Sequence, residues 1–444
     1  MTRVIRLPRD PGPAAWNELL LPAPPPRVLE ADRTADWLVI GAGFAGLAAA
    51  RRLTQLRGGD RIALVEAHRI GSGPAGRNSG FMIDLPHKLT SDNYAGVAEV
   101  DTTQTELNRA AIKFAAGAAE EYGLGPEAFC RSGKVNGAAT KRGLAANAAY
   151  ARHLASLGEP YELLDAAAMQ ELTGSEYYLG GVFTPGAAMI QPAMFVRGLA
   201  EGIAGRVAIF ESSPVIGLHR QGADWRVESP RGSITAPRVI LAVNGHVESF
   251  GYFRRRLVHI HLYASMTRAL TAEQARRLGG ARNWGITPAD PIGSTVRRIS
   301  GTSGDRIVIR NRVTYDPDME SDEVRLAAMG ESHDRSVNQR FPQLNGIDME
   351  YRWGGRLCLS LNDVPAFGEI DDGLFAACCQ NGLGTTKGTV SGMLAADLAA
   401  QGNSPLAAKM AAFDAPRRLP PEPIAWLGAN AALKWKEWRA RREI

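Results

Sequence analysis

The chain has 444 residues, of which 45% are hydrophobic and 22% are charged, and its formal net charge is +5. This composition excludes a chain that is disordered over most of its length, because the apolar content is sufficient for a buried core. Seven basic and three acidic residues lie within 417–444, so this tail carries +4 and the preceding 416 residues carry only +1. A nearly neutral body excludes a general binder of nucleic acid.

The four cysteines, Cys130, Cys358, Cys378 and Cys379, lack the paired spacing of a metal site and are too few for a disulfide framework in a chain of this length. The amino terminus has no apolar segment followed by a signal-peptide cleavage site. The longest uncharged stretch, 177–196, contains glycines and prolines that interrupt a membrane-spanning helix. We therefore expect a cytoplasmic protein that holds no metal.

In chain order, the first predicted segment is a proline-rich arm at residues 1–30. It is followed by a short apolar run at 36–40, by leucines and alanines at helical spacing over 47–56, and by a second apolar run at 61–66. This order predicts a strand, a glycine turn, a helix and a strand, which together form a βαβ unit of a parallel sheet. Further elements are expected as helices over 100–175 and 387–401, and as strands over 207–210, 225–227 and 238–243 and in several runs between 258 and 313.

A glycine motif lies in the turn of this βαβ unit. Gly41 permits a tight turn, Gly43 allows the backbone to approach a pyrophosphate, and Gly46 allows close packing of helix and strand. The following helix then offers free N–H groups and a positive dipole to phosphate. Glu66 lies 20 residues after Gly46 and can accept hydrogen bonds from a ribose, which argues against NADP. The motif favours a dinucleotide site over a turn without a ligand, but it does not distinguish NAD from FAD.

Three later segments help to distinguish FAD from NAD. They are Gly-Pro-Ala-Gly-Arg-Asn-Ser-Gly at 73–80, Leu-Ala-Val-Asn-Gly at 241–245 and Gln-Asn-Gly-Leu-Gly-Thr-Thr-Lys-Gly at 380–388. Together with the glycine motif they resemble the D-amino acid oxidase superfamily of flavoproteins, which includes glycine and sarcosine oxidases. Within it, the Gly-Arg-Asn-Ser-Gly sequence, the proline-rich arm and the tail with two adjacent prolines look most like the gamma-glutamylputrescine oxidoreductase branch. The resemblance spans residues 31–416 and weakly includes both ends.

The resemblance implies two domains. One is an α/β, Rossmann-like FAD-binding domain with a parallel sheet, and the other is an α+β substrate domain with a mainly antiparallel sheet. The FAD-binding domain is expected to be discontinuous, over 31–100, 188–247 and 355–416. The substrate domain is expected over 101–187 and 248–354, and a basic tail with tryptophans follows at 417–444.

The implied cofactor is FAD. Its adenosine end is expected at the glycine motif and Glu66, and its flavin ring at the start of the last helix, where a positive dipole stabilises reduced flavin. An ordinary turn between strand and helix is the alternative for the segment 380–388. The expected cofactor contacts are Gly41, Gly43, Phe44, Ala45, Gly46, Glu66, Ala67, Arg77, Asn78, Ser79, Gly80, Val215, Asn244, Gly245, Gly382, Leu383, Gly384, Thr385 and Thr386.

The resemblance also predicts that FAD is bound without a covalent link. Some relatives attach flavin through a histidine, and Arg77 occupies that position here. Others use a cysteine before the last strands, but Cys358 is offset from that place and is expected in the core. Many oxidases of the family place a lysine over the flavin, whereas no lysine lies between Lys141 and Lys387. The sequence therefore leaves open whether oxygen or another molecule accepts the electrons of the reduced flavin.

Four residues are candidates for the substrate side. His261 and Tyr263 share one face of a predicted strand at a period of two, and a half-solvated sheet face is the alternative. Arg310 belongs to the arginine-rich segment 297–312, which can clamp a carboxylate, and a solvated strand edge is the alternative. Trp353 precedes the final strands of the flavin domain and borders the predicted site, with core packing as the favoured alternative.

These residues predict FAD-dependent oxidation of a C–N bond in an amino acid or secondary amine, by hydride transfer to flavin N5, giving an imine that hydrolyses. The alternatives are a flavin monooxygenase, whose Gly-Asp pattern is missing at 368–373, and a non-catalytic subunit that holds FAD. The expected partner is a small-molecule amine or amino acid, nucleic acid is not expected, and a homodimer stays open. We expect the tail to pack on the flavin domain or a second subunit in preference to a membrane surface.

Overall fold

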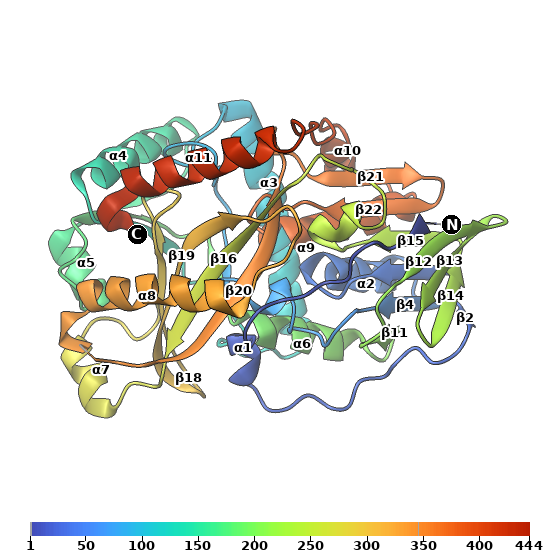
Figure 1. Cartoon of the computed structure of the whole chain (residues 1–444), viewed down its shortest axis with the longest axis horizontal. Coiled ribbons are helices and arrows are strands. Elements are labelled where there is room, and N and C mark those ends of the chain that lie inside the picture. Colours follow the sequence, from blue (N-terminus) through green and yellow to red (C-terminus); the bar gives the residue numbers. More distant parts are fainter. Residues whose placement is uncertain (1, 345) are drawn as a thin grey trace.

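The computed structural model describes residues 2–344 and 346–444, which fold into two halves with a cavity between them. Figure 1 shows the half with the amino terminus on the right and the half with the carboxyl terminus on the left. The centre of the first half is a six-stranded sheet made, in spatial order, of β11 (Val207–Phe210), β4 (Ile62–Val65), β3 (Trp37–Ile40), β15 (Arg238–Leu241), β22 (Leu374–Cys378) and β21 (Ala366–Asp371). All pairs in it are parallel except β21 with β22.

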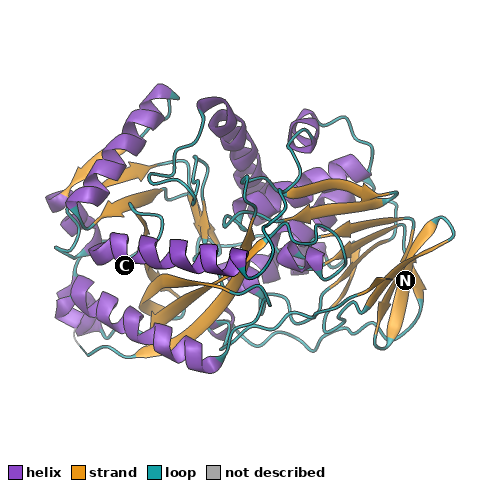
Figure 2. Cartoon of the chain, turned by 45° about the horizontal axis from the view of Figure 1, so that its top comes forward, coloured by secondary structure: helices purple, strands orange, loops and turns teal. Residues whose placement is uncertain are grey.

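Both faces of this sheet are covered, since its strands bury side chains on both sides. In β3, Val39 packs on one face and Leu38 on the other. Four helices cover the first face: α2 (Phe44–Leu56), α3 (Ala98–Glu121), α6 (Pro192–Ile203) and α9 (Thr386–Ala399). A five-stranded sheet, seen near the amino terminus in Figure 2, covers the second: β1 (Thr2–Arg3), β12 (Gly217–Gln221), β13 (Asp224–Ser229), β14 (Gly232–Ala236) and β2 (Arg33–Thr34).

The second half is built on an eight-stranded sheet. Its strands in spatial order are β20 (Met349–Leu359), β16 (Val258–Thr267), β19 (Gly304–Tyr315), β18 (Thr295–Gly301), β17 (Trp284–Pro288), β7 (Lys134–Ala138), β9 (Gly180–Thr184) and β8 (Glu162–Asp165). Neighbours are antiparallel except β17 and β7. Its helices are α4 (Lys141–Ser156), α5 (Ala166–Thr173), α7 (Ala272–Leu278), α8 (Glu323–Arg340) and α11 (Ile424–Ala440).

A small third sheet and several short elements complete the fold. The sheet consists of β5 (Phe81–Met82), β10 (Ala188–Ile190) and β6 (Phe129–Cys130). The remaining helices are α1 (Ala15–Glu18) and α10 (Pro405–Ala411), and the 3-10 turns are η1 (Pro74–Gly76), η2 (Asn244–Glu248), η3 (Pro342–Leu344) and η4 (Arg441–Glu443).

The predicted fold class is confirmed, because a parallel sheet with a βαβ unit stands beside a mainly antiparallel sheet. The helix expected over 387–401 is observed as α9. The expectation of helices over 100–175 is confirmed for α3, α4 and α5, but it is wrong for β6, β7 and β8, which lie between these helices. All five residues of β7 are buried between partners distant in sequence, so tertiary pairing outweighs the helical propensity of its alanine-rich surroundings.

The proline-rich arm runs along the surface but is anchored at its middle (Figure 1). Trp16 in α1 is fully buried, and its indole Nε1 donates to the carbonyl oxygen of Asn78 at 2.8 Å. The carbonyl oxygens of Pro11 and Gly12 each accept a hydrogen bond of 2.9 Å from Arg77. The arm therefore supports the loop that follows η1.

The tail packs on the second half, where α11 lies against β19. The end of the tail is buried in this half. The carboxylate of Glu443 accepts hydrogen bonds from Ala139 N at 3.0 Å and from Thr140 Oγ1 at 2.7 Å. The backbone carbonyl oxygen of Glu443 accepts a further hydrogen bond from Ser294 N at 2.6 Å. The expectation that the tail packs on the flavin domain is therefore wrong, because the tail is part of the half with the antiparallel sheet. Within residues 2–344 and 346–444, the longest apolar helices fall short of what is needed to span a membrane.

Candidate active site

A cavity of about 510 Å³ lies between the two halves. One end is bounded by the turn from β3 to α2 and by the end of β4. The start of α9, β16 and β20 form its middle, and β19, the loop after β5 and α11 close the other end. Because parallel strands end at one edge of a sheet, this edge brings loops from distant parts of the sequence to a single site.

The glycine turn is shaped as the sequence predicts. Gly41 has a φ of +99°, and a Cβ on it would lie 2.6 Å from the carbonyl oxygen of Ala242. A Cβ on Gly46 would lie 1.7 Å from the carbonyl oxygen of Gly41, so helix and turn are in direct contact. Gly43 lines the cavity, and no side chain caps the helix that starts after it. The free N–H groups at this helix start fit a phosphate group.

Glu66 lies beside this turn at the end of β4. Its Oε2 accepts a hydrogen bond from Ala42 N at 2.8 Å, and its Oε1 accepts one from His68 N at 3.1 Å. The carboxylate is therefore held in a fixed orientation at the cavity wall, next to Val215. Carboxylate oxygens have further acceptor capacity, which suits a ribose hydroxyl.

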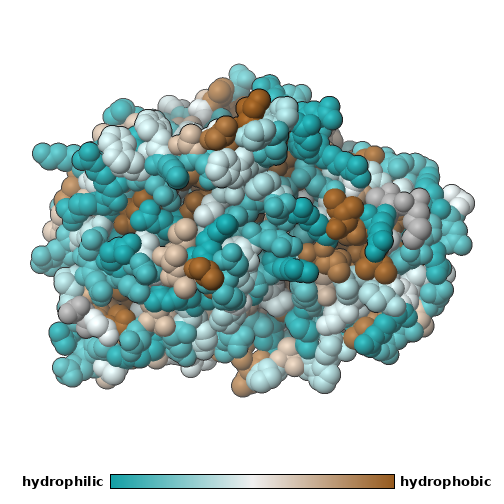
Figure 3. All heavy atoms as spheres, viewed as in Figure 1, coloured by the Kyte–Doolittle hydropathy of each residue, from teal (hydrophilic) through white to brown (hydrophobic). Residues whose placement is uncertain are grey.

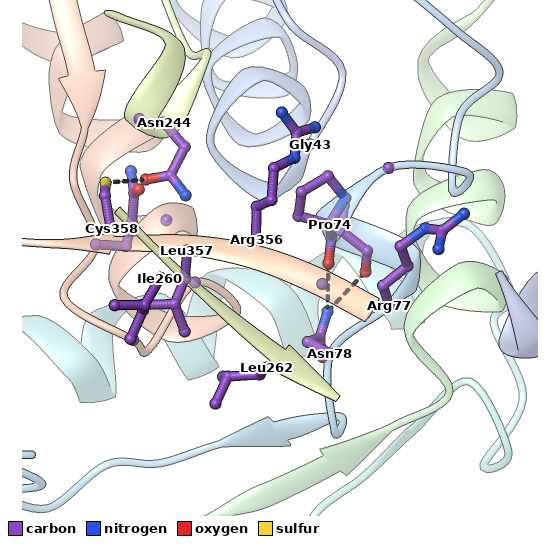
Figure 4. A pocket seen from close by; sticks show the side chains of 18 of the residues that line it. Gly43, Pro74, Arg77, Asn78, Asn244, Ile260, Leu262, Arg356, Leu357 and Cys358 are labelled. Carbon is purple, nitrogen blue, oxygen red and sulfur yellow. Dashed lines mark hydrogen bonds between the residues drawn. The ribbon is translucent and has the colours of Figure 1, made fainter. Parts of the chain in front are cut away.

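The loop 73–80 lines the cavity, but its polar side chains hold the loop itself. Asn78 Nδ2 donates to Ala75 O at 2.7 Å, and Asn78 Oδ1 accepts from Gly80 N at 2.8 Å. The side chain of Arg77 points away from Asn78 in Figure 4. Its guanidinium donates to carbonyl oxygens of the arm and of Gly354, and burial lowers its pKa from the ordinary value.

The start of α9 forms the middle of the wall. Gly382 has a φ of +83°, and no atom lies within 4 Å of a Cβ placed on Gly384, so the backbone is open to a large planar group. The hydroxyl of Thr385 donates to Phe81 O. Across the cavity the thiol of Cys358 donates to Asn244 Oδ1 at 3.3 Å (Figure 4). Hydrogen bonding to Cys379 and burial hold the pKa of Cys358 well above its ordinary value, so the thiol is protonated.

Arg310 lies at the far end of the cavity. It donates to Thr295 Oγ1 at 2.6 Å, and no ion pair to a carboxylate is found for it among the described residues. Burial lowers the pKa of Arg310, but a guanidinium stays charged at neutral pH. A half-buried cation without a counter-ion is poorly compensated, so this end of the cavity suits a ligand that carries an anionic group.

His87 belongs to the same end. Its ring stacks on Tyr94 with 4.0 Å between centroids, and its buried Nδ1 has no partner in the described ranges. Burial, together with the nearby charges of Lys134, Arg310 and Lys387, holds the pKa of His87 well below its ordinary value. The imidazole is therefore neutral, and the residue lines the cavity.

Most of the predicted cofactor contacts meet at this cavity. Gly46 and Thr386 do not line it: Gly46 lies under the turn, and Thr386 is buried in the first turn of α9. The predicted contacts that line the cavity are Gly41, Gly43, Phe44, Ala45, Glu66, Ala67, Arg77, Asn78, Ser79, Gly80, Val215, Asn244, Gly245, Gly382, Leu383, Gly384 and Thr385.

Of the four residues predicted on the substrate side, two line the cavity and two do not. Arg310 and His261 line the cavity, and His261 Nδ1 lies 3.4 Å from Asp316 Oδ2. Tyr263 and Trp353 do not line it. The hydroxyl of Tyr263 bonds to Thr314 Oγ1 at 2.8 Å, and Trp353 packs in the core.

The strand β16 presents its apolar face to the cavity. Ile260 and Leu262 line the wall (Figure 4), as does Ala264. The opposite face carries the polar residues, where Ser265 Oγ and His333 Nδ1 of α8 are 2.7 Å apart. The period of two is as predicted. On the polar face, however, Tyr263 and Ser265 are turned toward Thr314 and α8, whereas His261 lines the cavity beside Asp316.

Sequence reasoning missed three contributors to the cavity wall. His87 lies in a loop without a motif, and its only signal is its place soon after the segment 73–80. Asp10 of the arm is within 3.0 Å of Arg356, and both line the cavity. Leu433 and Lys436 of α11 also line it, together with Ala429 and Ala432. The helical spacing of these tail residues was a usable signal, but nothing in the sequence says which half they contact.

Comparison with known proteins agrees with this geometry. The sequence profile described as FAD dependent oxidoreductase (DAO) matches residues 36–398. The gamma-glutamylputrescine oxidoreductase of Escherichia coli is 26% identical over 382 residues, which cover 82% of this chain and 83% of that protein. A probable oxidoreductase, OrdL, of Rhizobium meliloti is 25% identical over 402 residues, which cover 88% of this chain and 89% of that protein.

Solved structures show the same fold. Glycine oxidase from Geobacillus kaustophilus superposes with a TM-score of 0.70 at 18% identity, over 88% of this chain and 100% of that one. L-proline dehydrogenase from P. horikoshii superposes with a TM-score of 0.65 at 16% identity, over 84% of this chain and 96% of that one. The glycine turn, the uncapped helix start, Glu66 and the open backbone at Gly384 fit the FAD that such a profile implies. The chain belongs to the DAO family of FAD-dependent oxidoreductases.

Proposed function

We propose that the protein oxidises the C–N bond of an amino acid, or of another amine that carries a carboxylate. The observation that carries this proposal is Arg310, a half-buried cation in the cavity wall whose side chain, among the described residues, is hydrogen-bonded to the neutral hydroxyl of Thr295 and to no carboxylate. Relatives named for amine and amino acid oxidation support the reaction class. The carboxylate is the part of the substrate that Arg310 recognises.

FAD would be held by residues that are far apart in the sequence but lie at the same edge of the parallel sheet. Gly41, Gly43 and Glu66 would contact its adenosine and pyrophosphate parts, and the start of α9 at Gly382 and Gly384 would contact its ring. Bound there, FAD supplies the acceptor for the hydride that leaves the carbon next to the nitrogen.

The chain's own groups prepare the substrate. Arg310 and Thr295 bind the carboxylate and orient the carbon that loses hydride. The cations Lys387, near His87, and Lys436, in the cavity wall, disfavour the ammonium form of the substrate, and the neutral His87 can accept a hydrogen bond from the amine. The apolar wall of Ile260, Leu262 and Ala264 keeps water from the reacting carbon, and the imine formed hydrolyses once it meets water.

Anaerobic reduction of the bound flavin tests this function. The purified protein is mixed with a panel of amino acids, N-methyl amino acids, polyamine conjugates and the matching amines without a carboxylate. We expect bleaching of the yellow band by members that carry a carboxylate and little change with the matched amines. Bleaching by no amine, or reduction by a nicotinamide cofactor alone, points instead to a subunit that holds FAD or to a monooxygenase.

We further propose that FAD is bound without a covalent link. The side chain of Arg77 is engaged by carbonyl oxygens, and the thiol of Cys358 is protonated and bonded to Asn244. A protonated thiol is a poor nucleophile. Acid precipitation is therefore expected to release all of the yellow colour into the supernatant, and colour that stays with the pellet contradicts the proposal. Stopped-flow reoxidation of the reduced protein in air then tells whether oxygen is the acceptor.

A further inference from the structure

The helix α11 has two apolar faces, and only one of them is covered. The inner face lines the cavity through residues such as Leu433 and Lys436. The outer face carries five apolar residues at successive spacings of three, four, four and three, which puts them on one side of a helix. They are Ile424, Leu427, Ala431, Trp435 and Trp438, and the exposed fractions of the four large ones are 61%, 58%, 52% and 67%. Figure 3 shows apolar spheres over the start of α11 at the upper edge of the molecule.

The acidic and basic side chains of the tail have different surroundings. All three of its acidic side chains have partners within the protein. Glu422 accepts from Tyr315 at 2.8 Å, Glu437 pairs with Arg312 at 3.3 Å, and Glu443 is buried.

Three of the basic side chains of the tail face solvent. Lys434, Arg441 and Arg442 are exposed, and the structure, as far as it is described, pairs none of them with a carboxylate. Lys434 lies next to the apolar outer face, four residues before Trp438, and Arg441 follows seven residues after Lys434. The outer surface of the tail is thus an apolar stripe with positive charge along it.

The stripe is held in place rigidly. Beyond the anchor of Glu443, the hydroxyl of Tyr177 donates to Arg442 O, and Arg439 pairs with Asp92. The helix therefore cannot turn its tryptophans inward without breaking these contacts. An exposed apolar stripe of this kind on a folded protein indicates a surface that binds another molecule or a membrane.

We propose that the outer face of α11, together with Lys434, Arg441 and Arg442, docks on the surface of a lipid bilayer that contains anionic headgroups. Tryptophan suits this place because its ring is apolar and its N–H remains able to contact headgroups or water. The unpaired cations are attracted to the negative surface. A second copy of the chain is disfavoured as the occupant, since two such helices packed together would oppose their positive charges.

Vesicle sedimentation with the full-length, FAD-loaded protein tests this proposal. Vesicles of phosphatidylcholine with and without phosphatidylglycerol are used at low and high salt. We expect binding to the anionic vesicles, a loss of this binding at high salt, and at least a tenfold weaker affinity in Trp435→Ser/Trp438→Ser and in Lys434→Glu/Arg441→Glu. Leu163→Ser removes an equally exposed apolar residue from β8 and serves as the matched control, with binding unchanged.

Several outcomes overturn the proposal. One is the absence of binding to either vesicle, and another is equal binding to both. A third is a dimer in light scattering that Trp435→Ser/Trp438→Ser dissociates, because a second copy would then be the occupant. Bound flavin and thermal unfolding of each variant are measured in parallel, so that misfolding is recognised and the charge-reversal pair remains an independent test.

Discussion

Arg310 and Thr295 are register partners on β19 and β18, and the guanidinium donates to the threonine hydroxyl at 2.6 Å. A guanidinium has five N–H donors, and this is the one hydrogen bond recorded for it among the described residues. The strand pair thus presents a cation to the cavity with most of its hydrogen-bonding capacity free.

Replacing Arg310 by alanine is expected to weaken the binding of carboxylate-bearing substrates. Charge-assisted hydrogen bonds to a carboxylate contribute about 1.5–3 kcal/mol, so KM should rise by roughly 10- to 100-fold. The KM of a matched amine without a carboxylate should change little. Steady-state kinetics with both substrates measure this.

Arg306→Ala is the matched control, since Arg306 lies four residues earlier on the same strand and does not line the cavity. An equal rise in KM for the two substrates in Arg310→Ala, or the same selective rise in Arg306→Ala, would contradict carboxylate recognition by Arg310.

Glu66→Ala is expected to weaken FAD binding. The substitution removes the acceptor of the Ala42 N–H in the glycine turn and an acceptor for the ribose. The loss of a hydrogen bond to a charged group corresponds to roughly a tenfold or greater rise in Kd. Titration of the apoprotein with FAD, followed by quenching of flavin fluorescence, measures the change. Asp36→Ala, which removes an exposed carboxylate paired with Arg61, should leave Kd unchanged.

The stability of the fold is expected to fall in mild acid, in part through His333. Burial lowers the pKa of His333 to about 3 from its ordinary 6.5, so the unfolded chain binds the additional proton between these values. The free energy of unfolding therefore decreases as pH falls below 6.5, by up to about 1.4 kcal/mol per pH unit for one proton. Urea unfolding at pH 7.5 and 5.0 should show a smaller difference in His333→Asn than in the parent. An identical difference in both proteins would exclude this contribution.

Removal of the tail after residue 416 is expected to open the cavity. Leu433 and Lys436 are part of its wall, and the end of the tail is anchored at Glu443. We expect a higher KM and stronger quenching of flavin fluorescence by iodide in the truncated protein. Trp438→Ser alters the outer face of the same helix and should leave both values unchanged. Unaltered KM and quenching after truncation would show that α11 does not shield the site.

The parts of the site that depend on local backbone geometry were predictable. The glycines of the motif are required where φ is positive, as at Gly41, or where two backbones touch, as at Gly46. These requirements restrict which residue types occur and at what spacing. Glu66 and the start of α9 could therefore also be identified from the sequence. The orientation of β16 was not predictable, because alternation groups His261 with Tyr263 but does not say that His261 lines the cavity and Tyr263 does not.

The sequence by itself determined the βαβ unit, the dinucleotide turn and the class of cofactor, because each rests on contacts between residues close along the chain. Tertiary structure alone decided that β7 is a strand, that Arg310 lies near His87, and that α11 lines the cavity. These arrangements depend on residues that are far apart in the sequence, and no local propensity encodes them. Tertiary structure also decided where the charges of the tail lie: its acids have partners within the protein, while Lys434, Arg441 and Arg442 remain exposed.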